Sequence, residues 1–190
     1  MRPSMRAVRV LGLAIVVGVI LASGGCMGRL LGEGAESAMG PKGAYFEEKP
    51  VAARKGHGLE AYQRFELGEV TNDFGRNVPP AFLREFPLQF AEQLAKSELP
   101  RAQSGKTAVF NVTILHYETA DLTDQVLGPL EQVIARVHLL DKDTGDLIAS
   151  GNALGRTGKT VGMGTAAKAQ GLAKALVRWA CDYYTRPKTD

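Results

Sequence analysis

Four segments of the chain alternate between apolar and polar residues, which predicts half-buried β-strands. The segments are Tyr62 to Val70, Lys106 to Thr119, Leu130 to Leu140 and Asp146 to Arg156. The apolar positions that would share one face are Phe65, Leu67, Phe110, Val112, Ile114, Val133, Ala135, Val137 and Leu139. Between the last two strands, the segment from Asp141 to Gly145 has the composition of a hairpin turn.

Two further segments repeat apolar residues at three- and four-residue spacing, which predicts helices with one buried stripe. The first opens at Pro79-Pro80, where proline suits the first turn of a helix. Pro87 lies inside its stripe and is expected to leave a short turn followed by a helix from Pro87 to Ser97. The second spans Thr165 to Tyr184. The two stripes are Phe82, Leu83, Phe86, Phe90 and Leu94, and Ala169, Leu172, Leu176, Ala180 and Tyr183.

The predicted order is strand, helix, strand, strand, strand, helix. Runs of strands with helices to one side indicate an α+β fold. We expect a two-layer sandwich over residues 61–186, with a mostly antiparallel four-stranded sheet and two helices on one face.

The N-terminus follows a different pattern. Arg2, Arg6 and Arg9 precede an apolar run from Val10 to Ala22, and small residues lead directly to Cys26. This is the layout of an export signal. The Cys after the small residues resembles a bacterial lipobox, which implies a signal peptide over residues 1–25 and lipid on Cys26. Ser23 departs from the usual Leu, and Met27 instead of Asp implies sorting to the outer membrane, facing the periplasm.

Two alternatives remain for the N-terminal segment. An uncleaved anchor would need about 20 apolar residues, more than the dense apolar run provides. A secretory signal with an incidental Cys would leave a free thiol near the new N-terminus in an oxidising compartment. Residues 26–60 are rich in Gly, Ala and charge without a period, and are predicted to form a flexible tether between lipid and domain.

Charge argues against nucleic acid as a partner. Without the three arginines of the signal, the 23 basic residues fall to 20 and equal the 20 acidic residues. Nucleic-acid binding requires a concentrated basic face. The only other cysteine, Cys181, falls on the apolar side of the last helix and is predicted to be a small buried hydrophobe.

Two stretches resemble ligand-binding sites. GRTGKT, from Gly155 to Thr160, resembles part of a phosphate loop, but Ala153 replaces its first Gly and glycines follow where a helix should begin. We therefore expect no bound nucleotide and a plain connection, with Arg156, Lys159 and Thr160 as the candidate ligand-binding residues if it is not. Asp141, Asp143 and Asp146 lack the Glu of a calcium loop.

The three histidines, His57, His116 and His138, lack metal-ligand spacing, and no catalytic Ser-His-Asp set is present. We expect no metal, no cofactor and no catalytic residue.

The signal with Cys26, the strand RFELGEVTND, the hairpin VHLLDKDTGDLIASG, the glycine loop and the Ala-rich final helix together resemble small bacterial lipoproteins with a domain of unknown function. That domain is similar to the α+β domain of the Tol–Pal translocation protein and of curli-type secretion lipoproteins. The resemblance covers Tyr62 to Tyr184 and implies no catalytic residues.

The predicted function is a non-enzymatic, membrane-anchored envelope lipoprotein whose domain binds or assembles with envelope proteins. The alternative is a periplasmic ligand-binding protein or hydrolytic enzyme that uses the loop at residues 155–164. Self-assembly through sheet edges is a third hypothesis.

Overall fold

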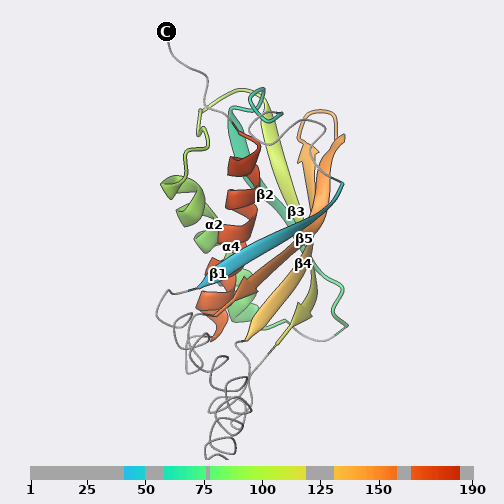
Figure 1. Cartoon of the computed structure of the whole chain (residues 1–190), viewed down its shortest axis with the longest axis vertical. Coiled ribbons are helices and arrows are strands. Elements are labelled where there is room, and N and C mark those ends of the chain that lie inside the picture. The colour runs from blue at the N-terminus through green and yellow to red at the C-terminus, as the bar shows by residue number, and fades with distance from the viewer. Residues whose placement is uncertain (1–40, 50–57, 76–77, 119–130, 158–163, 185–190) are drawn as a thin grey trace, which may run out of the picture. The chain divides into compact units, whose positions relative to one another are not determined.

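The computed structural model describes residues 41–49, 58–75, 78–118, 131–157 and 164–184. Five strands form one sheet in the order β1-β5-β4-β3-β2. The elements are β1 (Lys42–Lys49), β2 (Arg64–Asn72), α2 (Pro80–Lys96), β3 (Thr107–Tyr117), β4 (Gln132–Asp141), β5 (Leu147–Arg156) and α4 (Gly164–Asp182). Both helices lie on one side of the sheet (Figure 1). The predicted α+β class and its one-sided helix layer are confirmed.

The sheet is mostly antiparallel, and its single parallel pair in the described chain is β2 with β3. Parallel neighbours need a crossover connection, and α2 lies between these two strands in the sequence. The other neighbours pair antiparallel, and Gly145 in the β4–β5 turn has a φ of 75°. The predicted hairpin turn at Asp141 to Gly145 is therefore confirmed.

The prediction of four strands was wrong, because β1 adds a fifth from within the segment expected to be a tether. Its inward positions are Gly43, Tyr45 and Glu47, which give no apolar alternation. Tyr45 stacks on Trp179 with ring centroids 5.9 Å apart, and Glu47 accepts a hydrogen bond from Trp179 Nε1 at 2.8 Å. These partners lie more than a hundred residues away in the sequence, so the local pattern does not reveal the strand.

Glycines allow α4 to approach the sheet closely. A Cβ atom on Gly43 would lie 2.2 Å from the carbonyl oxygen of Gly171, and one on Gly155 would lie 2.4 Å from the amide nitrogen of Leu172. Contacts this short cannot form, so β1 and β5 meet the backbone of α4 only because these positions lack side chains. Gly155 therefore has a packing role at the start of the stretch that resembles a phosphate loop.

The predicted break at Pro87 was also wrong, because α2 runs through it. Proline removes the hydrogen bond to the carbonyl of Leu83, four residues earlier. Leu83, Pro87 and Leu88 are all on the exposed side of the helix, where water can satisfy that carbonyl. The buried side carries Phe82, Phe86 and Phe90, and the Phe90 ring lies 5.6 Å from that of Phe110 in an edge contact. Burial of this stripe keeps the helix continuous.

The core lies between the sheet and the two helices. The buried strand residues include all of the predicted inward positions of β3 and β4, and α4 buries its predicted stripe. The largest fully buried side chains include Phe82, Phe86, Phe110, Ile114, Leu139, Leu172 and Leu176.

Replacing Leu176, which is 0% exposed, tests this packing. We expect Leu176→Ala to lower the free energy of unfolding by about 2–5 kcal/mol, because it removes buried methyl groups and leaves a cavity. Urea denaturation of the purified protein measures the change. Leu88→Ala is the control, since Leu88 is 64% exposed and its loss should cost no more than about 0.5 kcal/mol. Equal urea midpoints for Leu176→Ala and the wild type would contradict the packing of α4.

Candidate functional site

The predicted lipidation site, Cys26, lies outside the described residues. The same holds for His57, Lys159 and Thr160. Among the residues that are described, no helix has the length and apolar character needed to cross a membrane. The assignments of Cys26, Lys159 and Thr160 therefore stay predictions from the sequence.

The part of the glycine loop that is described belongs to the sheet. Gly155 and Arg156 are the last residues of β5, and Arg156 is exposed. The loop ends at Gly164, where α4 begins. Of the three predicted ligand-binding residues, only Arg156 is therefore among the described residues. It lies at the end of β5, opposite Lys42 of β1 and Gln132 of β4.

A buried ion pair, which the sequence did not reveal, joins α4 to Glu131, the residue that precedes β4. Lys168 is 1% exposed, and its Nζ lies 2.5 Å from Glu131 Oε2. It also donates to the carbonyl of Glu118 and lies 4.1 Å from the centroid of the Tyr117 ring. Removing either charge would leave the other buried without a counter-charge, so the pair fixes the position of Lys168 on α4 against Glu131 and Glu118. Its sequence signal was weak: Lys168 precedes buried Leu172 by four residues, which places it on the flank of the stripe.

Asp141, considered above as part of a calcium loop, instead holds the β4–β5 turn. Its Oδ1 accepts the backbone N–H groups of Asp143 and Thr144 at 3.0 and 3.3 Å. Its Oδ2 accepts the hydroxyl of Tyr62 at 3.1 Å and lies 2.8 Å from Lys106 Nζ. The hydrogen bond from Lys106, followed by those of the turn, lowers the pKa of Asp141 to about 2. The carboxylate is therefore saturated by the protein itself.

Carboxylates and aromatic residues join β1 to α4. Glu47 accepts hydrogen bonds from Trp179 Nε1 and from the Tyr183 hydroxyl, both at 2.8 Å. Tyr45 donates its hydroxyl to Asp182. Burial and then the bond to Glu47 raise the pKa of Tyr183 to about 12, and burial and then the bond to Asp182 raise the pKa of Tyr45. The hydrogen bonds of these two tyrosines therefore hold the edge strand β1 against α4.

The two described histidines do not face one another. His138 is opposite Asn111, and His116 is opposite Ile134, with its ring 5.3 Å from that of Phe74. Within the described ranges, no group of three or more His, Cys, Asp or Glu residues could hold a metal ion.

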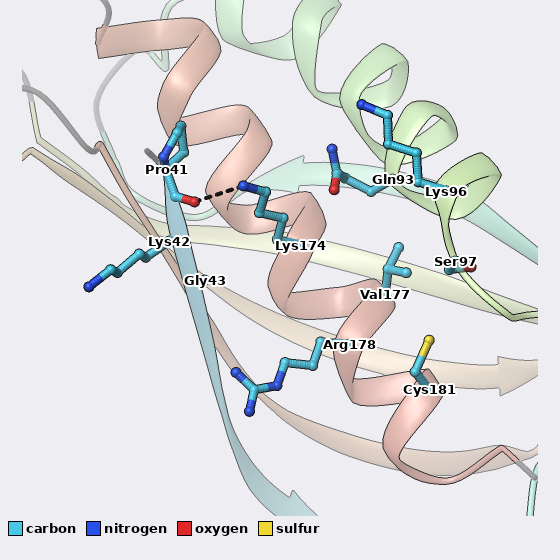
Figure 2. Close-up of a pocket in the computed structure, with 10 residues that line it drawn as sticks. All are labelled: Pro41, Lys42, Gly43, Gln93, Lys96, Ser97, Lys174, Val177, Arg178 and Cys181. Carbon is cyan, nitrogen blue, oxygen red and sulfur yellow. Dashed lines mark hydrogen bonds between the residues drawn. The ribbon is translucent and has the colours of Figure 1, made fainter. Parts of the chain in front are cut away.

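A groove of about 620 Å³ lies between the C-terminal part of α2, the C-terminal half of α4 and the first residues of β1. Figure 2 shows Lys174, Val177, Arg178 and Cys181 on α4, with Gln93, Lys96 and Ser97 across from them on and just after α2. Pro41, Lys42 and Gly43 complete its lining. A second cavity of about 570 Å³ adjoins the start of α4 and has neutral lining residues, among them Gln89 and Thr165.

Cys181 is half-buried in the wall of the groove, which corrects the prediction that it lies in the core. It packs against the core with one side only. Burial raises the pKa of its thiol. The thiol is therefore more protonated than an ordinary cysteine and is a poor nucleophile.

No known family model matches this sequence, and no curated protein matches it either. Solved structures with a similar fold include the PelC dodecamer from Paraburkholderia phytofirmans, which is 15% identical, with a TM-score of 0.48 over 76% of this chain and 99% of that chain. A chain from Caulobacter crescentus named "putative lipoprotein" is 15% identical, with a TM-score of 0.29 over 61% of this chain and 81% of that one. A Xanthomonas campestris protein of the DUF330 family is 12% identical, with a TM-score of 0.35 over 73% and 89% of the two chains.

At these identities and TM-scores, none of the likenesses assigns a role to this chain. The resemblance to the Tol–Pal translocation protein stays a prediction.

The Asp141 contacts predict an acid-sensitive part of the fold. A carboxylate whose pKa is lowered by folding stabilises the folded state above its ordinary pKa, and this contribution is lost as the pH falls through the folded value. For Asp141 these two values are 3.8 and about 2. The difference in unfolding free energy between wild type and Asp141→Asn should be constant above about pH 5 and should shrink as the pH falls from 4 towards 2.

Urea denaturation at a series of pH values measures this difference. Asp143→Asn is the matched control, because Asp143 is an exposed residue of the same turn. The difference in unfolding free energy between wild type and Asp143→Asn should not shrink in this way as the pH falls from 4 towards 2. A difference for Asp141→Asn that does not change between pH 4 and 2 would contradict the role given to the Asp141 carboxylate.

Proposed function

We propose that this chain is a cell-envelope lipoprotein, anchored through lipid on Cys26, whose domain is a non-enzymatic module for binding or assembly. The proposed location is the outer membrane, with the domain facing the periplasm. The likeness to the Tol–Pal and curli-type domains belongs to the same proposal and rests on the sequence motifs given above.

The anchor is supported by the order of features at the N-terminus. Three arginines, an apolar run without charge, and a small-residue stretch ending at Cys26 follow one another within 26 residues. Acylation also accounts for a cysteine at this position better than a free thiol in an oxidising compartment does.

Replacing Cys26 tests the anchor. We expect Cys26→Ser to accumulate as an unprocessed precursor or to leave the membrane fraction, because each buried methylene of an acyl chain contributes about 0.8 kcal/mol to anchoring. Membrane fractionation and the intact mass of the mature protein measure the two effects. Cys181→Ser is the matched control, since Cys181 is the only other cysteine, and it should remain in the membrane.

Two results would contradict the lipid anchor. An unmodified Cys26 in the mature protein would exclude acylation. A wild-type protein that stays in the membrane and whose intact mass still includes residues 1–25 would favour an uncleaved anchor.

The observation that supports a binding or assembly module is the sheet face opposite the helices. A row of outward positions crosses all five strands there, since each of its residues pairs in register with the next. The row consists of Phe46, Asn152, Arg136, Thr113 and Thr71. Neither described helix lies on this face (Figure 1). At one end of the row Phe46 is 64% exposed, on an edge strand whose outer backbone groups pair with no other described strand.

An exposed aromatic residue at a sheet edge is a common anchor for another protein chain, because burying it gains apolar area while the strand offers backbone hydrogen bonds. By contrast, the described titratable groups with shifted pKa values mostly hold elements together, as at Asp141, Tyr183 and Tyr45. The titratable groups therefore serve the fold, whereas the exposed sheet edge is available to bind another protein chain.

Phe46→Ala tests the module. We expect it to reduce cross-linking of the lipoprotein in intact cells, whether the cross-linked species contains a second copy of this chain or another envelope protein. Leu88→Ala is a matched control, because Leu88 is also 64% exposed but lies on α2. Mass spectrometry of the cross-linked species separates self-assembly from binding to another protein. An unchanged pattern for Phe46→Ala would contradict this surface, and loss only in Leu88→Ala would move the contact to the helix layer.

A further inference from the structure

The groove between α2 and α4 is lined by cations from three separate elements. Lys42 comes from β1, Lys96 from α2, and Lys174 and Arg178 from α4. No Asp or Glu belongs to its described lining. The mature chain as a whole carries no net charge by count, so this groove concentrates positive charge locally.

The cations do not converge on one point. Lys174 donates to the carbonyl of Pro41 at 3.0 Å, and an ammonium retains two further N–H donors after one such bond. Figure 2 shows Lys42 projecting away from α4, while Arg178 extends from the other side of the groove. Lys96 pairs with Glu92 at 2.5 Å, but both side chains are exposed, and such surface pairs are exchanged at little cost. An array of separate anionic groups fits this arrangement better than one small anion does.

The wall between the cations is apolar. Pro41, Val177 and the half-buried Cys181 form part of it. Basic side chains around apolar residues are typical of protein surfaces that contact the headgroup region of a bilayer.

The position of the groove in the chain points to the same partner. Pro41, in the lining, is 15 positions after Cys26. At about 3.3–3.6 Å per residue, even a fully extended chain between them spans at most about 54 Å. The groove therefore contains the described residue that is nearest to Cys26 along the chain.

We propose that this groove binds the phosphate groups of anionic phospholipids in the membrane that holds the lipid on Cys26. The inference rests on the proposed lipid anchor. Arg178 contacts phosphate through its guanidinium group and the lysines through their ammonium groups. The anchor keeps the protein on the membrane, and the groove turns the α2–α4 surface towards it and leaves the opposite sheet face directed away.

The test uses the full processed chain, purified from envelopes and mixed with vesicles of phosphatidylcholine, with or without phosphatidylglycerol, at low and high salt. Lysine acetylation followed by mass spectrometry reports the accessibility of each ammonium group. We expect Lys42, Lys96 and Lys174 to be protected only in the phosphatidylglycerol vesicles and only at low salt, because salt screens exposed charges. Lys142, in the turn at the opposite end of β5, should react equally in all samples.

A double variant, Lys96→Gln with Arg178→Gln, should remove most of the protection of Lys174. Removing one cation near an anionic membrane weakens attraction about fivefold, so two removals weaken it about 25-fold. The matched control is Arg136→Gln with Lys142→Gln, which removes the same charges from exposed positions on the opposite sheet face and in the β4–β5 turn. Equal urea midpoints for the two double variants show that both fold.

Each other outcome overturns the proposal. Equal reactivity of the groove lysines in all vesicles shows that no phosphate contacts them. Protection in both kinds of vesicle shows that the groove does not select anionic phospholipids, because phosphatidylcholine also carries a phosphate group. Protection in native envelopes but in neither vesicle assigns the groove to an acidic protein.

Failure of the anchor gives a different result. A chain without lipid on Cys26 would not float with neutral vesicles. Its flotation with phosphatidylglycerol vesicles, and the loss of that flotation in the groove variant, would still report on the groove.

Discussion

The close approach of α4 to β1 and β5 is the constraint on which the rest of the described domain depends. Gly43, Gly155 and Gly171 have no side chains where these backbones meet, and a Cβ atom at any of them would overlap backbone atoms. This contact brings Tyr45 and Glu47 against Trp179. It also places Pro41 beside Lys174, so the groove between the helices is closed on one side by the same strand.

Charged groups inside this domain mainly connect segments that are distant in the sequence. Lys168 and Glu131 join α4 to the start of β4, and Asp141 joins the hairpin turn to Tyr62 and Lys106. A buried charge that loses its partner is costly, so each pair favours one arrangement of the chain over its competitors. In the stretch that resembles a phosphate loop, Gly155 likewise has a structural role, because it allows β5 to pack closely against α4.

The domain presents two surfaces of different chemistry. The α2–α4 groove is basic and lies next to the point where the chain enters from Cys26, whereas the opposite sheet face carries Phe46 at its edge and a row of mostly polar residues. Under the proposed anchor, one of these surfaces would meet the membrane and the other would meet a protein partner. The two proposals above assign these roles to opposite layers. The role of the groove depends on the lipid anchor but not on the role of the Phe46 face.

Within the part of the chain that the structure describes, the sequence by itself determined the α+β class, four of the five strands, both helices and most of the core, because period-2 and period-3.6 patterns report local burial. It could not determine β1, whose inward positions are a glycine, a tyrosine and a glutamate. Nor could it determine the continuity of α2 through Pro87, which depends on that residue lying on the exposed side. The ion pair of Lys168 and the basic groove also escaped it, since their members come from separate elements. Only the tertiary structure decided these features, because each depends on a partner that the fold brings close and that local sequence does not contain.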